Sequence, residues 1–327
     1  MNVGFDVSPL LQTQAGTARY VQGLGDALER LPDVRLTRLS FGGRGRPAAL
    51  ARDLAWYLAL LPLRGGLDVL HCTTYRAPLR ARAPVVVTVH DLAVLRYPEL
   101  FPAWTRLYGR AWLRPTLRAA ARVIAVSEFT KREVVALAGV PAERVRVVPN
   151  ATDDAVFTAE GPSADGEYVL ALGTLEPRKN LARLAQATDR LGVELRLVGA
   201  RGWGRVDLDG ARVRWLGRLP DEEVAALYRG ALCFAYPSLY EGFGIPVLEA
   251  MRCGAPVVTS ARSAMEEVAG DAAELVDPLD PAAIADGIRR AIERRAELRA
   301  AGLERAQLFS WHAAASATAD VYREVAA

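Results

Sequence analysis

The sequence is poor in cysteine and has no long apolar run. Its three cysteines, Cys72, Cys233 and Cys253, are odd in number, lie in apolar stretches and lack metal-site spacing. We therefore interpret them as small buried hydrophobic residues in a reducing compartment. No stretch approaches the roughly 18 uncharged apolar residues of a membrane span. The N-terminus has no basic region followed by an apolar run, so we expect no signal peptide and a cytoplasmic protein.

Motifs of several nucleotide and metal enzymes are also absent. There is no Gly-x-Gly-x-x-Gly at a strand-to-helix turn, no Gly-x-x-x-x-Gly-Lys-Ser/Thr loop and no His-Glu-x-x-His. One Asp-x-Asp pair, Asp207 and Asp209, matches a common metal-binding pattern. It lies in a turn rich in glycine and charge rather than at a strand end, so we interpret it as solvent-facing. We expect no metal and no cofactor.

The composition that remains is that of a globular protein with two domains. At 327 residues, 51% of them hydrophobic, the chain is long for a single core. Its net charge of +3 hides an asymmetry: residues 1–155 hold 21 Lys and Arg against 13 Asp and Glu, whereas residues 156–327 hold 20 against 25. A basic N-terminal half is suited to an anionic membrane or an acidic acceptor.

Short apolar runs alternate with longer segments of helical periodicity, which predicts strands joined by helical crossovers. The expected strands are Val3–Val7, Arg35–Ser40, Asp68–Cys72, Val85–His90, Val123–Ser127, Val145–Pro149, Tyr168–Leu172, Glu194–Val198, Val213–Leu216, Leu232–Tyr236, Pro256–Ser260 and Glu274–Val276. Such alternation predicts an α/β protein with parallel sheets covered on both faces. We expect two doubly wound, Rossmann-like domains, 1–155 and 156–327, facing a central cleft at the carboxyl ends of their strands. The last helical segment is expected to pack on either domain.

The densest group of functional candidates follows the tenth expected strand. Gly242 and Gly244 relieve the backbone, and Pro246 stands where a helix would begin. The free amides of this turn would point out of a helix N-terminus, which favours a phosphate. Glu241 precedes the turn and Glu249 lies one turn into the helix, and ionised carboxylates accept hydrogen bonds from hydroxyls. The stretch therefore predicts a diphosphate between hydroxyl-rich rings, which is a nucleotide-sugar.

A second candidate, residues 173–180, follows the first expected strand of the second half. Only two of the 41 basic residues are lysines, Lys131 and Lys179. Where arginine dominates, a lysine beside Arg178 indicates a need for a compact charge of the kind that binds phosphate. We interpret Lys131 as an ordinary surface residue.

Three further positions stand at the ends of expected strands or the start of a helix. His90 ends a strand and is followed by Asp91, so we expect His90 at the cleft. His71 also ends a strand, and we interpret it as a core residue. Gly16 opens a helix after the first strand and would allow the backbone to approach a phosphate or sugar closely.

One helical segment repeats arginine at every fourth position, which keeps the side chains on one helix face. These are Arg106, Arg110, Arg114, Arg118 and Arg122. The face is either solvated over a packed aromatic face or docks on anionic lipid headgroups. Pro115 is expected to interrupt the helix. Another apolar segment, Leu54–Leu61, is too short to span a membrane, and we interpret it as a core helix.

The stretch Glu241–Glu249, read as Glu-Gly-Phe-Gly-Ile-Pro-Val-Leu-Glu, resembles the signature of retaining glycosyltransferases of the GT-B fold, family 4. Residues 173–181 are similar to the diphosphate-binding turn of bacterial members, many of them mannosyltransferases. Further stretches fall in the same order as in that family, namely His90-Asp91, Ser127–Lys131, Val148–Asn150 and Phe309–Trp311. The similarity covers essentially the whole chain.

The resemblance implies a role for each position. The catalytic residues would be Glu241, His90, Arg178 and Lys179. The donor-binding residues would be Gly16, Gly173, Thr174, Gly242, Phe243, Gly244, Ile245 and Glu249. Arg19, Tyr20 and Asp91 would border the acceptor. Within these sets, Glu241 would hold the donor sugar, Glu249 the ribose, and Arg178 with Lys179 the diphosphate.

Two positions depart from the family pattern. Ala15-Gly16 stands where a pair of glycines is usual, and Thr174 stands where some relatives carry an additional arginine. Arg178 would then supply that charge alone, which leaves the division of work between Arg178 and Lys179 open.

The implied reaction moves a hexose from a nucleotide-sugar to a hydroxyl of a glycan or lipid-linked acceptor. The donor we expect first is GDP-mannose, so that the hexose is mannose. No residue in these motifs is an evident nucleophile, which favours front-face attack with retention of configuration. The nearest alternative is a UDP-sugar donor, because no motif reads the base. A nucleotide-sugar epimerase shares the architecture, and a catalytically silent partner subunit would too. A two-lobed sugar-binding protein would normally carry an export signal. We expect no nucleic-acid partner.

Overall fold

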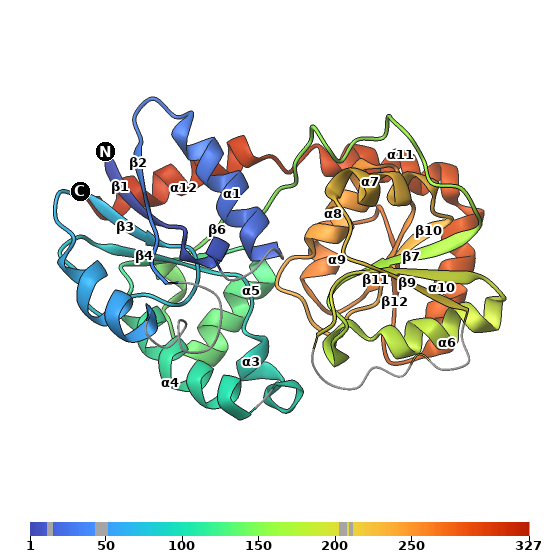
Figure 1. Cartoon of the computed structure of the whole chain (residues 1–327), viewed down its shortest axis with the longest axis horizontal. Helices are drawn as coiled ribbons and strands as arrows, with labels where there is room; N and C mark the ends of the chain where they lie inside the picture. Colours follow the sequence, from blue (N-terminus) through green and yellow to red (C-terminus); the bar gives the residue numbers. More distant parts are fainter. Residues whose placement is uncertain (12–15, 43–51, 102, 203–207, 209–211, 327) are drawn as a thin grey trace. The chain divides into compact units, whose positions relative to one another are not determined.

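The computed structural model describes residues 1–11, 16–42, 52–101, 103–202, 208 and 212–326 (Figure 1). The chain divides into two compact units. The first consists of Met1–Ala151 together with Ser310–Ala327, and the second of Thr152–Phe309. The division lies a few residues before the expected boundary at 155, and the last helix belongs to the first unit.

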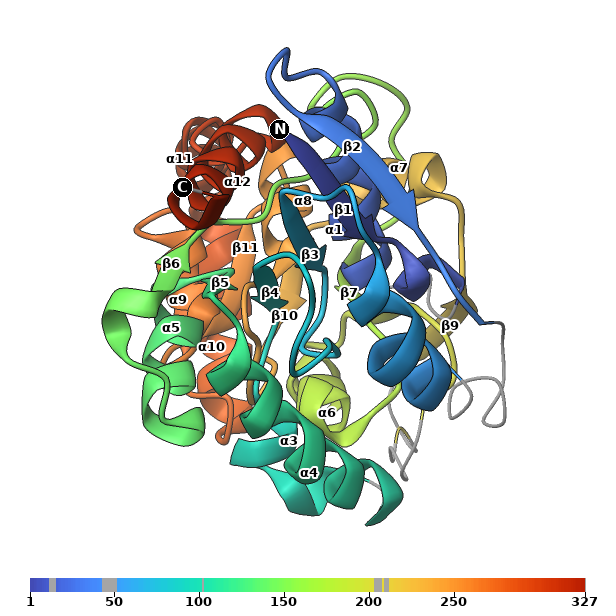
Figure 2. The ribbon, with the colours of Figure 1, turned by 90° about the vertical axis from the view of Figure 1, so that its left-hand side faces the viewer.

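The first unit is built on a six-stranded parallel sheet of order β2-β1-β3-β4-β5-β6, whose strands Figure 2 shows in this sequence. The strands are β1 (Asn2–Asp6), β2 (Arg35–Leu39), β3 (Val69–Cys72), β4 (Val85–Val89), β5 (Arg122–Ala125) and β6 (Val145–Val147). Because β2 lies on one side of β1 and the later strands lie on the other, the winding direction reverses between β1 and β3.

Helices cover both faces of this sheet. The α-helices are α1 (Gly16–Glu29), α3 (Ala93–Arg96), α4 (Ala103–Ala119), α5 (Glu128–Glu133) and α12 (Trp311–Ala326). Single turns of 3-10 helix are η1 (Ser8–Leu11), η3 (Leu61–Leu63), η4 (Pro98–Leu100) and η6 (Ala142–Arg144), and π-helical segments are η2 (Arg52–Leu60) and η5 (Val134–Ala138).

Alternate side chains of each strand enter different cores, as the period of a strand requires. Val85 and Val87 join Leu117 of α4 in one core. Val86 joins the other, formed with α1 and α12. Helix α12, red in Figure 1, packs beside the blue α1 although it ends the chain. Its Tyr322 is fully buried there.

The second unit contains a parallel sheet of order β12-β11-β10-β7-β8-β9. Its strands are β7 (Tyr168–Leu172), β8 (Glu194–Val198), β9 (Val213–Gly217), β10 (Cys233–Tyr236), β11 (Val257–Ser260) and β12 (Glu274–Val276). Its helices are α6 (Leu181–Leu191), α7 (Asp221–Gly230), α8 (Ile245–Arg252), α9 (Ala264–Ala269), α10 (Pro281–Glu293), α11 (Arg295–Ala306) and the 3-10 turn η7 (Pro177–Lys179). Helices α6 and α10 bury their apolar sides against β7, β8 and β10 on one face. The predicted α/β class, with two doubly wound parallel sheets, is confirmed.

One local prediction was wrong. Helix α4 continues through Pro115 to Ala119. Pro115 is exposed, so water can satisfy the carbonyl that loses its partner. The segment Leu54–Leu61 is helical and contributes Trp56, Tyr57 and Leu61 to the core, as predicted, whereas Leu58 is 49% exposed.

Candidate functional site

The candidate site of the second unit lies where its sheet changes direction. The chain winds from β7 to β8 and β9 on one side, and β10, β11 and β12 lie on the other. At such a point the turns after the two central strands diverge, and open α/β sheets bind ligands there. The turn after β7 and the turn after β10 are joined by a hydrogen bond from the Leu239 amide to the Arg178 carbonyl, 2.9 Å long. The two stretches singled out in the sequence therefore meet.

The turn after β7 requires glycine at its first position. Gly173 has φ of +142°, which side chains rarely adopt, and a Cβ there would lie 3.2 Å from Cε of Lys179. Asn180 closes the turn in the left-handed region, φ 59°, and its Nδ2 donates to the carbonyls of Pro237 and Pro278. The turn is thus pinned so that the Lys179 side chain runs directly past Gly173. Thr174, also in this turn, is partly exposed.

Arg178, Lys179 and Glu241 form one ion-pair cluster. Glu241 Oε2 lies 2.9 Å from Nη1 of Arg178, and Glu241 Oε1 lies 2.7 Å from Nζ of Lys179. Arg178 Nη2 also donates to Oε1 of Glu176 at 2.7 Å, and the Lys179 ammonium donates to the Tyr236 hydroxyl. Three of the four predicted catalytic residues are therefore brought together.

Burial and charge act against one another on these groups. Burial favours the neutral form of Glu241, but Arg178 and Lys179 outweigh it and lower the pKa of this carboxyl to about 2. Burial lowers the pKa of Lys179, and Glu241 partly opposes that shift. Burial also raises the pKa of Glu176, against the opposing charge of Arg178. Glu241 is the most firmly ionised carboxylate of the cluster.

The turn after β10 leads into α8 as the sequence predicts. Gly244 caps the helix with φ of +105°, and Pro246 stands in its first turn. Phe243 is buried edge-to-face against Phe309, with ring centroids 5.8 Å apart. Gly242 and Ile245 are also buried.

Glu249 lies on α8 and is fully buried, with its Oε2 accepting from the Tyr228 hydroxyl at 3.2 Å. Its predicted contact with the ribose stays a prediction.

In the first unit, His90 follows β4 and is held by two contacts. Its Nε2 lies 2.9 Å from the Thr73 carbonyl, so Nε2 carries the hydrogen, and its ring meets that of Tyr20 edge-to-face at 4.7 Å. Burial lowers the pKa of His90, partly offset by Thr73 and Asp91. The imidazole is therefore neutral near pH 7, with Nδ1 as the proton acceptor.

The acceptor-side residues differ in their surroundings. Tyr20 is buried, and its hydroxyl lies 2.8 Å from Oγ1 of Thr88. Asp91 lies just before α3, and its Oδ1 accepts from the Ala93 amide at 3.0 Å. Arg19 is partly exposed on α1, and Gly16 is exposed at the start of that helix. Ala15, Asp207 and Asp209 lie outside the described residues.

Two members of the cluster were not assigned from the sequence. Tyr236 is the last residue of β10, and Glu176 stands two positions before Arg178. Both lie at or just after the carboxyl ends of the central strands. That position in the sequence is the signal that could have identified them as site residues. His71 is a core residue as expected: it is fully buried between Tyr322 and Thr88, and burial lowers its pKa to about 3.

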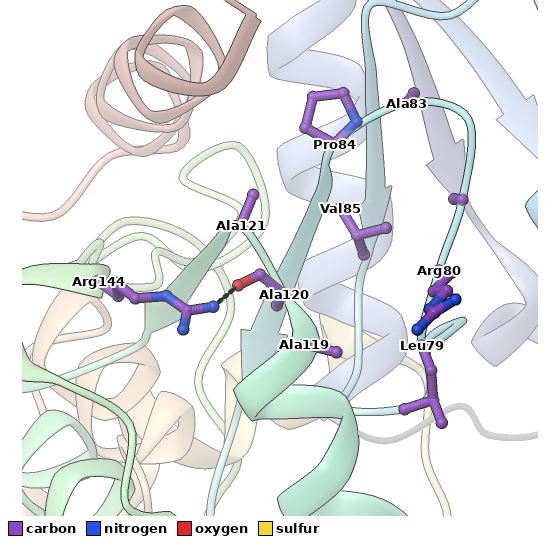
Figure 3. A pocket seen from close by; sticks show the side chains of 10 residues that line it. Leu79, Arg80, Ala83, Pro84, Val85, Ala119, Ala120, Ala121 and Arg144 are labelled. Carbon is purple, nitrogen blue, oxygen red and sulfur yellow. Dashed lines mark hydrogen bonds between the residues drawn. The ribbon is translucent and has the colours of Figure 1, made fainter.

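A separate hollow of about 520 Å³ lies in the first unit (Figure 3). Its walls include Leu79, Pro84, Ala120 and Arg144, and Arg144 donates to the Ala120 carbonyl. It also contains Val85, the first residue of β4, so it lies at the amino ends of the strands. None of the predicted site residues lines it.

Models of known families match both halves of the chain. Residues 4–156 match the family described as Glycosyltransferase Family 4, and residues 153–308 match Glycosyl transferases group 1. Among curated proteins, the O-antigen chain mannosyltransferase B of Escherichia coli is 36% identical over 73% of this chain and 70% of its own length.

Solved structures share the fold. A sucrose-phosphate synthase from Thermosynechococcus elongatus superposes with a TM-score of 0.75 at 23% identity, over 99% of this chain and 98% of its own. Anabaena HepE in complex with UDP-glucose superposes with a TM-score of 0.73 at 20% identity, over 99% of this chain and 100% of its own. The predicted GT-B fold is confirmed.

Proposed function

This chain belongs to glycosyltransferase family 4, and we propose that it is a retaining hexosyltransferase that moves mannose from GDP-mannose to a hydroxyl of a glycan or lipid-linked acceptor. The observation that carries this proposal is the cluster of Arg178, Lys179 and Glu241 at the switch point of the second sheet. It combines two cations for a diphosphate with a carboxylate that can accept from sugar hydroxyls.

The cluster suits the departure of a nucleoside diphosphate. Negative charge develops on phosphate oxygens as the glycosidic bond breaks, and fixed cations aimed there stabilise the transition state. Arg178 and Lys179 are held by their partners, so little reorganisation is needed at the moment of reaction. They take the role that a divalent ion plays in metal-dependent transferases.

Retention by front-face attack is the mechanism we propose. The acceptor hydroxyl attacks the anomeric carbon from the side of the leaving group, and a departing phosphate oxygen takes its proton. No residue of these motifs is an evident nucleophile, and we expect Glu241 to accept hydrogen bonds from the hydroxyls of the donor sugar. We place the neutral His90 beside the reacting sugar, where it can accept a hydrogen bond at Nδ1.

The choice of mannose is supported by the name of the E. coli relative, and a UDP-sugar donor is the alternative that the HepE complex favours. A thermal-shift panel of GDP, UDP, ADP and their hexose conjugates tests the donor. We expect the largest stabilisation with GDP-mannose, and turnover followed by NMR should give a product of retained anomeric configuration. Stabilisation by UDP-sugars alone would replace the donor. Turnover of the sugar without any acceptor would indicate an epimerase, and binding without turnover a silent subunit.

We also propose a peripheral contact with anionic membrane through α4. Arg106 and Arg110 are exposed, and Leu107 between them is 68% exposed. Residues 52–122 hold eleven arginines against four acidic residues, which matches an anionic lipid surface. Arg114 and Arg118 each donate to a backbone carbonyl of η5, so they have a structural task as well. Among the described residues, no helix combines the length and hydropathy needed to cross a bilayer.

A further inference from the structure

The two cations proposed to hold the diphosphate are already neutralised within the second unit. Arg178 and Lys179 lie with Glu176 and Glu241 in a cluster of four formal charges that cancel. The side chains of all four are at most 13% exposed. An incoming diphosphate therefore meets two cations that already have carboxylate partners.

The two carboxylates differ in origin and in contacts. Glu176 belongs to the same turn as the cations and pairs with Nη2 of Arg178. Glu241 comes from the other turn, after β10, and bridges the cations, with one oxygen on Arg178 and the other on Lys179. Glu241 thus places one oxygen on each of two cations. A phosphate group can bind the same two cations in the same way.

Lys179 keeps a partner if Glu241 turns away. The Tyr236 hydroxyl accepts from its ammonium, and the ammonium lies 4.9 Å from the centre of the Tyr236 ring. Arg178 likewise keeps Glu176 and the Tyr240 carbonyl, which accepts from Nη1 at 2.8 Å. The cations can thus stay in place while their bridging anion is exchanged.

We infer that Glu241 is a displaceable internal anion, which neutralises Arg178 and Lys179 in the free enzyme and gives them up when a nucleotide-sugar binds. The inference rests on the proposed function. The sugar hydroxyls of the donor donate to Glu241 and so compensate it for the cations that the diphosphate takes. A nucleoside diphosphate lacks the transferred hexose and therefore offers Glu241 no hexose hydroxyls. Its diphosphate must compete with Glu241 for the two cations. Glu241 therefore favours binding of the donor over the product and helps the product leave.

The test compares the affinities of product and donor in Glu241→Gln, measured by titration calorimetry with GDP and GDP-mannose, or with the pair that the donor panel selects. Glutamine keeps the shape and removes the charge. We expect GDP to bind about tenfold more tightly than to the wild type, equivalent to about 1.4 kcal/mol, and the preference for GDP-mannose over GDP to shrink. Unchanged or weaker GDP binding would overturn the inference, because a carboxylate that only holds the sugar does not oppose GDP.

The chain offers a matched control for this substitution. Glu274 is also buried and also pairs with two arginines, Arg290 and Arg294, but it begins β12 at the edge of the sheet. Glu274→Gln should lower the melting temperature and leave the GDP affinity within twofold of the wild type. An equal gain in GDP affinity in this variant would also overturn the inference.

A second measurement needs no substitution at the site. The chain has only two lysines, so ¹⁵N-lysine labelling gives two side-chain ammonium signals, and Lys131→Arg assigns them. Titration of the wild type with GDP should shift the Lys179 signal as its partner changes from carboxylate to phosphate. A Lys179 signal that stays fixed while GDP binds would refute the exchange. If the wild type binds no nucleotide or nucleotide-sugar, the proposed function itself fails, which is a different result.

Discussion

The ammonium of Lys179 lies 2.7 Å from Oε1 of Glu241, although the two residues are 62 positions apart. They follow different strands, β7 and β10, which are neighbours in the sheet. This pairing converts two separate sequence motifs into one charged group. It also means that each of the two side chains depends on the other for its charge in a buried place.

Replacing Lys179 by alanine should reduce turnover far more than nucleotide affinity. Removing one charge aimed at a transition state costs on the order of 10²–10³ in kcat, whereas Arg178 still holds the ground-state diphosphate. Steady-state kinetics and calorimetry measure the two effects, and Lys131→Ala is the matched control. Wild-type turnover in Lys179→Ala would remove this residue from the catalytic set.

Gly173→Ala should lower both stability and donor affinity. Its φ of +142° strains any side chain, and the new Cβ would lie 3.2 Å from the Lys179 side chain. Gly192→Ala is the control, because Gly192 also has a positive φ, +68°, but an added Cβ meets nothing within 4 Å. Both variants should lose about 1 kcal/mol or more of unfolding free energy, with reduced nucleotide binding in Gly173→Ala alone. Equal binding in the two would show that the turn tolerates the methyl group.

Turnover should persist in excess EDTA. The proposal gives the task of charge neutralisation to Arg178 and Lys179, which no chelator removes. Activity before and after EDTA, with magnesium and manganese added back, is the measurement. A loss that either metal restores would return Asp207 and Asp209 to consideration as ligands.

His71 should make the first unit less stable as the pH falls. Burial lowers its pKa to about 3 in the folded protein, against about 6.5 when unfolded. Between about pH 3 and pH 6.5 His71 is protonated in the unfolded chain but not in the folded protein. The free energy of unfolding is therefore undiminished above pH 6.5 and falls by up to about 1.4 kcal/mol per pH unit below it. Urea unfolding at pH 7 and pH 4.5 should show a steeper loss in the wild type than in His71→Gln. An equal loss of unfolding free energy in the wild type and in His71→Gln would mean that His71 does not titrate in this range.

Binding to liposomes should require anionic lipid and the exposed arginines of α4. Arg106→Ala with Arg110→Ala should weaken sedimentation with phosphatidylglycerol vesicles, because each arginine contributes about 1 kcal/mol near such a surface. Neutral phosphatidylcholine vesicles and an Arg289→Ala variant, exposed on α10 of the second unit, serve as controls. Equal binding by all proteins would leave α4 as a solvated face. Arg114 and Arg118 are less suitable for this test, since their loss would also disturb η5.

Local patterns were sufficient for much of the fold. The apolar runs and the Gly, Pro and Asn residues between them predicted the strands of both sheets in the described part of the chain, because a buried parallel strand must be short, apolar and β-branched. The cap at Gly244 and the proline in the first turn of α8 likewise depend on neighbours in sequence. These features are decided within a few residues, so local patterns are enough to predict them.

Features that join residues far apart in the sequence could be known only from the tertiary structure. The contacts of Tyr236 and Glu176 with the cations exist because β7 and β10 are adjacent, and no spacing in the chain states that adjacency. The place of α12 beside α1 depends on packing. The fold also decides that Pro115 is exposed, so that α4 continues past it. Sequence alone therefore determined which side chains carry charge and which turns present them. The fold decided that the charges neutralise one another, because ion pairing needs distances of a few ångströms that only the assembled sheet creates.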